Sequence, residues 1–253
     1  MRLKPVYQQN KRKKSTIIAL SFGILLIAIL VGIAVYLSDY YPADESVQAS
    51  LSDSNTVKVT KENNWIVFMP VERTTESGLI FYPGGKVDEL AYVPILRSLA
   101  DQGIPSVLVS MPFRLAVLRS GAAASVIDAF PSINQWYIGG HSLGGAMAAS
   151  YAANNPEDIE GVILLAAYPP SDLSQYELKL LSIYGNQDLV LNMDRYMENR
   201  SYFPADFLEV IIDGGNHANF GDYGEQSGDG QALISAQEQQ RITIEAIQSF
   251  INP

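Results

Sequence analysis

A Gly-x-Ser-x-Gly pentad at residues 140–144 constrains the fold of this chain more than any other feature. The apolar run 136–139 precedes it, and the small, helix-forming residues 146–150 follow it. This order predicts a strand, a sharp turn with Ser142 at its apex, and a helix. Such a turn presses its backbone against neighbouring elements, so it requires glycines at positions 140 and 144. It also directs the first N–H groups of the helix toward the serine, where they could stabilise an oxyanion.

Short apolar runs alternate with helix-like segments on both sides of this turn. Strands are predicted at 78–82, 106–110, the run before Ser142, 162–167, 179–184 and 208–212. Helices are predicted at 88–102, 115–130, the segment after Ser142, 191–199 and 231–251. The alternating runs 56–60 and 65–69 predict an antiparallel hairpin at the sheet edge. Because strands that are apolar throughout are typical of a sheet covered on both faces, the sequence predicts an α/β fold with a mostly parallel sheet.

Residues 16–37 form an uncharged, mostly apolar segment near the N-terminus. As a helix it would be about 33 Å long, close to the thickness of about 30 Å of a bilayer's hydrocarbon core. This length favours a membrane span over a buried core helix. The basic cluster 11–14 lies just before it, within a basic N-terminus of residues 1–15. Because basic residues flank the cytoplasmic end of a membrane span, we expect a signal anchor with the following domain outside the cell. The alternative is a signal peptide cleaved near 47–49, which would release a secreted protein.

The chain after this segment divides into a short polar stretch and one domain. Residues 38–54 are rich in Ser, Asp and Ala without apolar periodicity, which predicts a linker. Residues 55–253 carry the alternating strands and helices, so they are predicted to form a single α/β domain.

Composition excludes several classes of function. The chain has no cysteine, so disulfides, thiolate metal sites and a cysteine nucleophile are excluded. Its two histidines are too few for a multi-histidine metal centre. Residues 39–253 contain 11 basic and 27 acidic side chains, a net charge of −16, so this part is expected to be a poor nucleic-acid binder. The chemistry suggested below requires no cofactor and no metal.

Chemically active residue types follow the predicted strands at their carboxyl ends, where the sites of open α/β sheets lie. Ser142 follows one strand, Asp188 the penultimate strand and His217 the last strand. A serine hydroxyl becomes a strong nucleophile when a histidine accepts its proton and a carboxylate orients that histidine. The three residues therefore predict a catalytic triad. The backbone N–H of Leu143 and an N–H of the Gly85-Lys86 turn are the predicted oxyanion donors.

Other interpretations of these residues remain open at this stage. Ser142 could be an ordinary helix N-cap, and His217 a loop histidine. Asp172 and Asp213 compete with Asp188 as the acid. His141 beside the nucleophile is expected to be structural, and the Lys86 side chain to be solvated. The tyrosines Tyr82, Tyr92 and Tyr168 are expected to pack at the rim of the site. The acids of a Gly-rich loop are expected to be solvated, with a cation or substrate contact as the alternative: Asp222, Glu225 and Asp229.

Three motifs in this chain resemble those of a known group of enzymes. They are Phe-Tyr-Pro-Gly-Gly-Lys-Val at 81–87, Gly-Gly-His-Ser-Leu-Gly-Gly-Ala-Met-Ala at 139–148, and Gly-Gly-Asn-His-Ala-Asn-Phe-Gly-Asp-Tyr-Gly at 214–224. Together they resemble the α/β-hydrolase superfamily, and within it a group of small dienelactone-hydrolase-like members, over residues 56–251. The resemblance implies a Ser–Asp–His hydrolase. The chain has serine where true dienelactone hydrolases have cysteine, which argues against lactone chemistry.

The predicted function combines these observations. Only residues 168–177 separate two neighbouring strands at the position where lid-bearing lipases insert a cap, so no cap domain and a shallow, open pocket are expected. We expect a membrane-anchored extracellular serine hydrolase that cleaves a small carboxylic ester or another acylated substrate through an acyl-enzyme. The lipid bilayer is the expected partner of residues 16–37. The alternatives are a peptidase or amidase with the same triad, and a non-catalytic binding domain at the cell surface.

Overall fold

The computed structural model describes residues 6–62, 64–72 and 75–252, with side chains from residue 20 onward. The chain divides into two units, one ending at Tyr40 and the other beginning at Tyr41. The first unit contains the long helix α1 (Val6–Ser38). Within the described residues, α1 alone has a part, Leu20–Ser38, that is long and apolar enough to cross a membrane.

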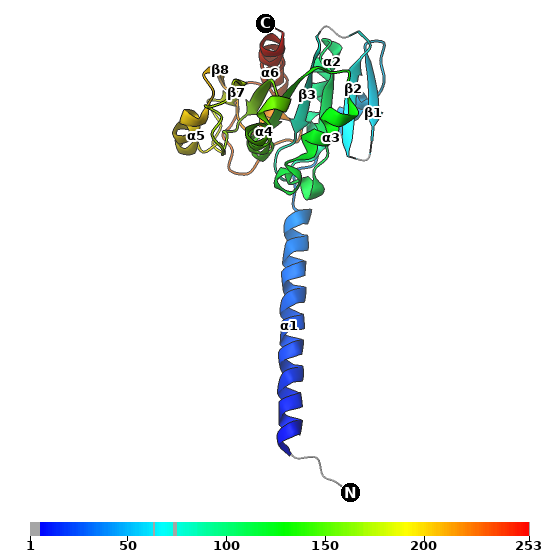
Figure 1. Ribbon diagram of the computed structural model, residues 1–253, viewed down its shortest axis with the longest axis vertical. Helices are drawn as coiled ribbons and strands as arrows, with labels where there is room; N and C mark the ends of the chain where they lie inside the picture. Colours follow the sequence, from blue (N-terminus) through cyan, green and yellow to red (C-terminus); the bar gives the residue numbers. More distant parts are fainter. Residues whose placement is uncertain (1–5, 63, 73–74, 253) are drawn as a thin grey trace. The chain divides into compact units, whose positions relative to one another are not determined.

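The second unit is built on an eight-stranded sheet (Figure 1). Its strands lie in the order β1-β2-β4-β3-β5-β6-β7-β8. Pairing is antiparallel between β1 and β2 and between β2 and β4, and parallel between all other neighbours. The strands are β1 (Val57–Lys61), β2 (Trp65–Pro70), β3 (Ser77–Tyr82), β4 (Ser106–Val109), β5 (Gln135–His141), β6 (Gly161–Leu165), β7 (Lys179–Gly185) and β8 (Asp206–Ile212). The predicted mostly parallel sheet and its antiparallel edge hairpin are therefore confirmed.

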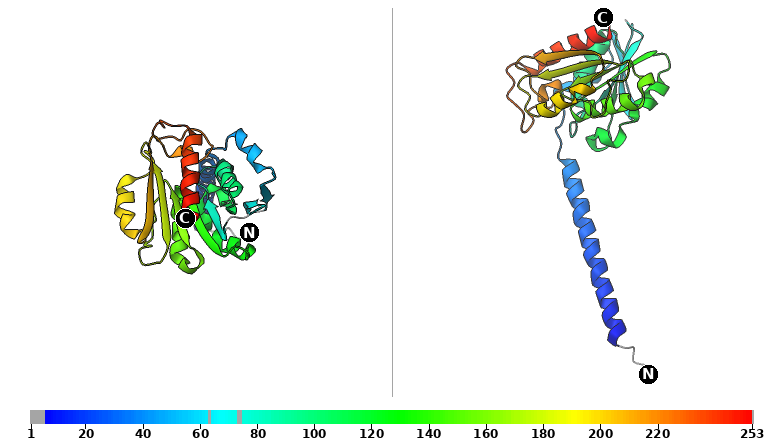
Figure 2. Two further views of the ribbon diagram at one scale, coloured as in Figure 1. Left: turned by 90° about the horizontal axis from the view of Figure 1, so that it is seen from above. Right: turned by 60° about the vertical axis from the view of Figure 1, so that its left-hand side comes forward.

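Helices cover both faces of this sheet. Buried side chains of α2 (Val93–Asp101) and α6 (Ala236–Ile251) pack in one hydrophobic cluster. Those of α3 (Ala122–Ala129), α4 (Leu143–Asn154) and α5 (Met193–Asn199) pack in a second cluster on the other face. In Figure 2, α6 (red) and α5 (yellow) accordingly lie on opposite sides of the strands. Short 3₁₀ helices complete the fold: η1 (Glu45–Leu51), η2 (Glu89–Tyr92), η3 (Pro112–Arg114), η4 (Ala116–Arg119), η5 (Pro156–Asp158), η6 (Arg200–Tyr202) and η7 (Ala218–Phe220).

The central strands are mostly apolar because both of their faces are covered. Every residue of β3 and of β6 is buried. Successive side chains of a strand point to opposite faces. Accordingly, Ile80 and Tyr82 pack in the cluster with α3 and α4, whereas Leu79 and Phe81 pack in the cluster with α2 and α6.

The segment predicted as one helix over 115–130 is broken in the structure. It contains η4 and the shorter α3, and η3 precedes them. The break lies at Ser120 and Gly121, between η4 and α3. Just before the predicted segment, Phe113 (φ 53°) and Arg114 (φ 59°) have left-handed backbone conformations, so no helix extends back through them. The Tyr82 hydroxyl holds the start of α3, because it accepts the N–H of Ala123 and donates to the Ser120 carbonyl.

Three other predicted helices begin later than expected. The segment predicted at 88–102 starts with η2 before α2, which carries a proline in its first turn. The Asn192 side chain caps α5, which therefore starts at Met193. The Ser235 hydroxyl accepts the N–H of Glu238 and caps α6, so the residues from 231 to 235 are not helical. Between β6 and β7, residues 166–178 contain no helix or strand, so the expected absence of a cap domain is confirmed at this position.

Most of the stretch predicted as a free linker, 38–54, packs on the domain. Val47 of η1 is buried with 1% of its surface exposed. The Arg97 guanidinium of α2 donates to the carbonyls of Ser50 and Ser52. Tyr41 pairs with the turn after β3, donating its N–H to the Lys86 carbonyl at 2.8 Å. Burial of Val47 and these long-range hydrogen bonds fix this stretch on the domain, although its composition is polar.

Candidate active site

Ser142 lies at the turn between β5 and α4. Its backbone has φ 51° and ψ −122°, a conformation that is rare for a residue with a side chain. The Ser142 N–H donates to the Leu165 carbonyl of β6, and the Ser142 carbonyl accepts the N–H of Ala146. These bonds hold the strained turn from both sides. Strain at a residue that bears a hydroxyl is typical of a functional site, where the surrounding structure maintains it.

The glycines of the pentad allow this turn to lie close to β3. A Cβ atom at Gly144 would overlap the carbonyl oxygens of Tyr82 and Pro83. A Cβ atom at Gly140 would lie 2.6 Å from the Tyr82 carbonyl oxygen and from the Gly144 backbone. Both positions therefore require glycine for close approach of the backbone.

Asp188 and His217 form a buried pair. The distance from Asp188 Oδ2 to His217 Nδ1 is 2.9 Å, and 1% of each side chain is exposed. Asp188 Oδ1 accepts the N–H groups of Val190 and Leu191, each at 2.8 Å. Three hydrogen bonds therefore fix this carboxylate. The carboxylate accepts a hydrogen bond from the Nδ1–H of His217. In the neutral ring this tautomer leaves Nε2 without a proton.

The Nε2 atom of His217 is buried and has no hydrogen-bond partner within the described residues. His217 and Ser142 line the same pocket. A catalytic hydrogen bond is often long or absent before substrate binds. The structure thus brings Ser142, Asp188 and His217 to one place, with a direct contact between the acid and the histidine.

The two competing acids lie elsewhere. Asp172 is exposed, and its carboxylate accepts the N–H and the hydroxyl of Ser174. Asp213 is also exposed and accepts the side-chain N–H of Asn186. Their carboxylates bind these groups, whereas the Asp188 carboxylate binds His217.

The predicted oxyanion donors are only partly suited to that role. Leu143 is the first residue of α4, so its N–H has no acceptor within the helix. Gly85 lies beside it, since a Cβ atom there would be 2.9 Å from Leu143 Cδ2. The prediction for Lys86 is corrected: its N–H donates to the Arg114 carbonyl at 3.0 Å and is not available to a substrate. Leu143 and Gly85 remain as the candidate donors.

The ring of His141, next to the nucleophile, contacts that of His217, with centroids 4.5 Å apart and planes tilted by 51°. The Tyr92 hydroxyl lies 2.8 Å from His141 Nδ1 and accepts the N–H of Gly84 at 3.1 Å. Burial raises the pKa of Tyr92, so its hydroxyl stays protonated and can donate a hydrogen bond to His141 Nδ1. Burial first, and the neighbouring His217 second, lower the pKa of His141 well below its usual value, so this ring stays neutral. His141 and Tyr92 thus support the glycine turn after β3.

A neutral buried histidine makes folding depend on pH. Because the pKa of His141 is lowered in the folded state, the unfolded state binds the extra proton below about pH 6.5, and stability falls as pH falls. At pH 5.5 this loss is on the order of 1–2 kcal/mol, or about 3–6 °C in Tm. The variant His141→Asn keeps an acceptor near the Tyr92 hydroxyl and does not titrate.

Thermal melting of both proteins at pH 7.5 and 5.5 measures the effect. The parent is expected to lose about 3–6 °C more than the variant on acidification. The other titratable groups around this ring, Tyr92, His217 and Tyr223, are present in both proteins. Equal losses of Tm in parent and variant would contradict the prediction.

The three tyrosines predicted at the rim of the site differ in their burial and position. Tyr82 and Tyr92 are fully buried, which corrects their placement at the rim. Tyr168 lines the pocket that contains Ser142 and His217. This pocket has a volume of about 370 Å³, and most of its lining is apolar. The lining residues are Ser142, Leu143, Ala146, Ala166, Ala167, Tyr168, Pro170, Val190, Leu191, Asn192 and His217.

Comparisons with known proteins show the family and the fold. The family model described as "Alpha/beta hydrolase family" matches residues 78–241, which is more than half of the chain. The chain belongs to the alpha/beta hydrolase family. No match is found among curated proteins.

Solved structures show the same fold. A dienelactone hydrolase from Anabaena variabilis is 16% identical with a TM-score of 0.58, over 78% of this chain and 100% of the other. An esterase from Mycobacterium tuberculosis is 14% identical with a TM-score of 0.56, over 81% and 94% of the two chains. A predicted hydrolase from Thermoplasma acidophilum is 18% identical with a TM-score of 0.53, over 76% and 97%. At these identities the similarity shows a shared fold alone.

Proposed function

We propose that this alpha/beta hydrolase is a serine esterase that cleaves carboxylic esters through an acyl-enzyme. The observation that carries the proposal is the buried Asp188–His217 pair: within the described residues the Nε2 atom of His217 has no hydrogen-bond partner, and His217 lines the same pocket as Ser142. A base oriented in this way next to a serine on a strained turn has the parts required for nucleophilic catalysis.

The mechanism follows from the position of each group. Ser142 Oγ attacks the acyl carbon while His217 Nε2 takes its proton, and the oxyanion is stabilised by the N–H groups of Leu143 and Gly85. The tetrahedral species collapses as His217 returns that proton to the alkoxide, which leaves as an alcohol. Water then attacks the acyl-enzyme while His217 takes its proton. The bond between Ser142 Oγ and the acyl carbon breaks as His217 passes that proton to Oγ, which releases the carboxylic acid and restores the serine. Asp188 stabilises the imidazolium at each step.

The pocket suits a small acyl group. Leu143, Tyr168 and Leu191 give it apolar walls. No helix or strand lies between β6 and β7, where a cap would cover it. We infer short acyl esters, or an acyl group on a larger molecule, as substrates.

Anchoring by α1 is part of the same proposal. The segment Leu20–Ser38 has the length and composition of a membrane span. With the basic residues 11–14 in the cytoplasm, the hydrolase domain would be extracellular. The intact mass of the protein recovered from membranes tests this arrangement, since cleavage near 47–49 would remove α1 and release the domain.

A fluorophosphonate probe tests for an activated serine. The full-length protein in detergent is expected to be labelled at Ser142, and the variants Ser142→Ala and His217→Ala are expected to lose labelling while they remain folded. Ser150→Ala is the matched control, because Ser150 lies on the same helix, bonds the Ala146 carbonyl and is outside the pocket. A folded parent that is not labelled would instead support a non-catalytic binding domain. If labelling succeeds, paired ester and amide substrates distinguish an esterase from an amidase.

A further inference from the structure

The loop between η7 and α6 contains an aspartate with three backbone partners. Asp229 Oδ2 accepts the N–H of Ala218 at 2.8 Å. Asp229 Oδ1 accepts the N–H of Gly230 at 2.8 Å and that of Leu189 at 3.4 Å. Asp229 is therefore not a solvated loop acid, the interpretation favoured by the sequence.

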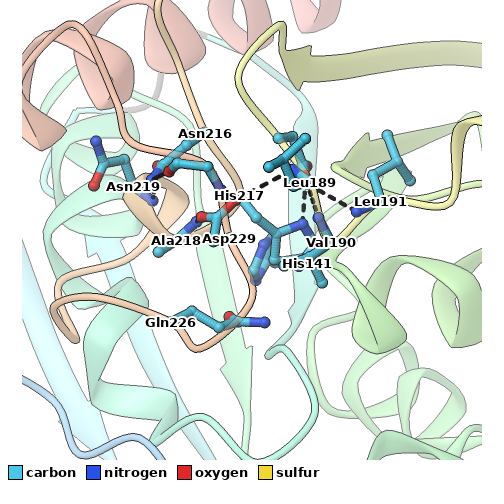
Figure 3. A network of polar contacts seen from close by, with 12 residues as sticks. His141, Leu189, Val190, Leu191, Asn216, His217, Ala218, Asn219, Gln226 and Asp229 are labelled. Carbon is cyan, nitrogen blue, oxygen red and sulfur yellow. Dashed lines mark hydrogen bonds and ion pairs between the residues drawn. The ribbon is translucent and has the colours of Figure 1, made fainter.

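Two of these partners are the neighbours of the candidate acid and base. Ala218 directly follows His217, and Leu189 directly follows Asp188. The Asp229 carboxylate thus joins the loop after β8 to the loop after β7, on which the two members of the pair lie. Figure 3 shows Asp229 close to Ala218 and His217, with Leu189 on the adjoining loop.

The rest of the Asp229 loop is fixed to the same two segments. The Gly230 carbonyl accepts the side-chain N–H of Asn216 at 2.9 Å. A Cβ atom at Gly230 would overlap the Gln187 carbonyl oxygen, so the two backbones are in close contact. The loop therefore lies against the residue before His217 and the residue before Asp188.

The other side of Asn216 is held by α6. Its N–H donates to Gln239 Oε1 at 3.0 Å, and Gln239 Nε2 donates to its carbonyl at 2.7 Å. Asn216 and Ala218, which flank His217, are thus both fixed by side chains. Gln239 holds the first of these residues and Asp229 the second.

Asp229 acts from outside the substrate pocket. It does not line the pocket of Ser142 and His217, but a separate polar pocket of about 570 Å³ together with Asn216, Ala218 and Gln226. Its effect on the reaction is therefore expected to act through the position of His217.

We propose that Asp229 is a positioning residue that holds the His217 loop against the Asp188 loop and so keeps Nε2 of His217 aimed at the Ser142 hydroxyl. This inference rests on the proposed function. A displacement of about 1 Å in a catalytic group can lower a rate about 100-fold, so removal of this brace is expected to affect kcat. Substrate binding, which uses other residues, is expected to change little.

Two substitutions of Asp229 are expected to lower kcat to different extents. Asp229→Ala removes both acceptor oxygens, and with them the three hydrogen bonds described above, and is expected to lower kcat about 10- to 100-fold with KM within about twofold. Asp229→Asn keeps an oxygen for Ala218 but turns an amide N–H₂ toward the N–H groups of Leu189 and Gly230. It is expected to give an intermediate kcat.

Hydrolysis of p-nitrophenyl butyrate and the rate of fluorophosphonate labelling provide the measurements, on full-length protein in detergent. Glu225→Ala is the matched control, since Glu225 is an exposed acid of the same loop and its kcat is expected to equal that of the parent. Melting curves establish that each variant is folded. If Asp229→Ala does not fold, Asp229→Asn carries the comparison.

The outcomes separate this inference from the proposed function. A parent that is folded and unlabelled would refute the esterase and, with it, the role of Asp229. An active parent whose folded Asp229 variants keep its kcat would refute only the role of Asp229. The same holds if the variants change KM instead of kcat, or if Glu225→Ala lowers kcat equally.

Discussion

The variant Asp188→Asn is expected to lower kcat for p-nitrophenyl butyrate about 10⁴-fold, the scale known for this change in a serine-protease triad, while KM changes little. The Asp188 carboxylate accepts the Nδ1–H of His217 on one oxygen and the N–H groups of Val190 and Leu191 on the other. An asparagine can offer its single oxygen to only one of these sites. With the amide N–H₂ facing His217, the ring would carry its proton on Nε2 and could not accept one from Ser142.

Asp172→Asn and Asp213→Asn are the controls for this prediction. Both residues are exposed acids whose carboxylates bind groups other than His217. Each control is expected to keep kcat within about twofold of the parent, since surface substitutions away from a site have small effects. Steady-state kinetics on the three variants measure the difference. A large loss of kcat in either control, or none in Asp188→Asn, would place the acid elsewhere.

The sheet could be predicted from sequence because its signal is local. Strands β3 and β6 are apolar at nearly every position, which distinguishes strands covered on both faces from amphipathic elements. The left-handed turn before η4 could not be predicted. The left-handed conformations of Phe113 and Arg114 accompany a hydrogen bond from Lys86 to the Arg114 carbonyl, and no local pattern encodes that contact.

The candidate site shows the same division. Parallel strands end at one edge of a sheet, so residues that follow β5, β7 and β8 could be expected to meet. Contacts between groups far apart in the sequence could not be predicted. These contacts include the hydrogen bond that the Lys86 N–H donates to the Arg114 carbonyl and the burial of Val47 against the domain. They also include the hydrogen bonds from Leu189 and Ala218 to Asp229. A glycine on each side of Asp229 was the available signal, but flanking glycines are typical of many loops.

The variant Gly144→Ala is expected to destabilise the domain by about 3 kcal/mol or more, which corresponds to about 6–12 °C in Tm, and to abolish labelling of Ser142. The added Cβ atom would overlap the carbonyl oxygens of Tyr82 and Pro83. These belong to backbone at the end of the fully buried strand β3, which cannot rotate away as a flexible side chain could. To accept the methyl group, the turn would have to move from β3, and Ser142 would move away from His217.

Gly121→Ala is the matched control for this last prediction. Gly121 has φ −81°, and beyond its adjacent residues no atom lies within 4 Å of the position that an added methyl group would take, so alanine fits there without strain. This substitution is expected to leave Tm unchanged or to raise it slightly, because alanine reduces the entropy of the unfolded chain. Melting curves and fluorophosphonate labelling of both variants provide the comparison. If Gly144→Ala keeps the Tm and the labelling of the parent, the contact between the Ser142 turn and β3 is looser than the geometry requires, and that contact is not what holds Ser142 in its strained conformation.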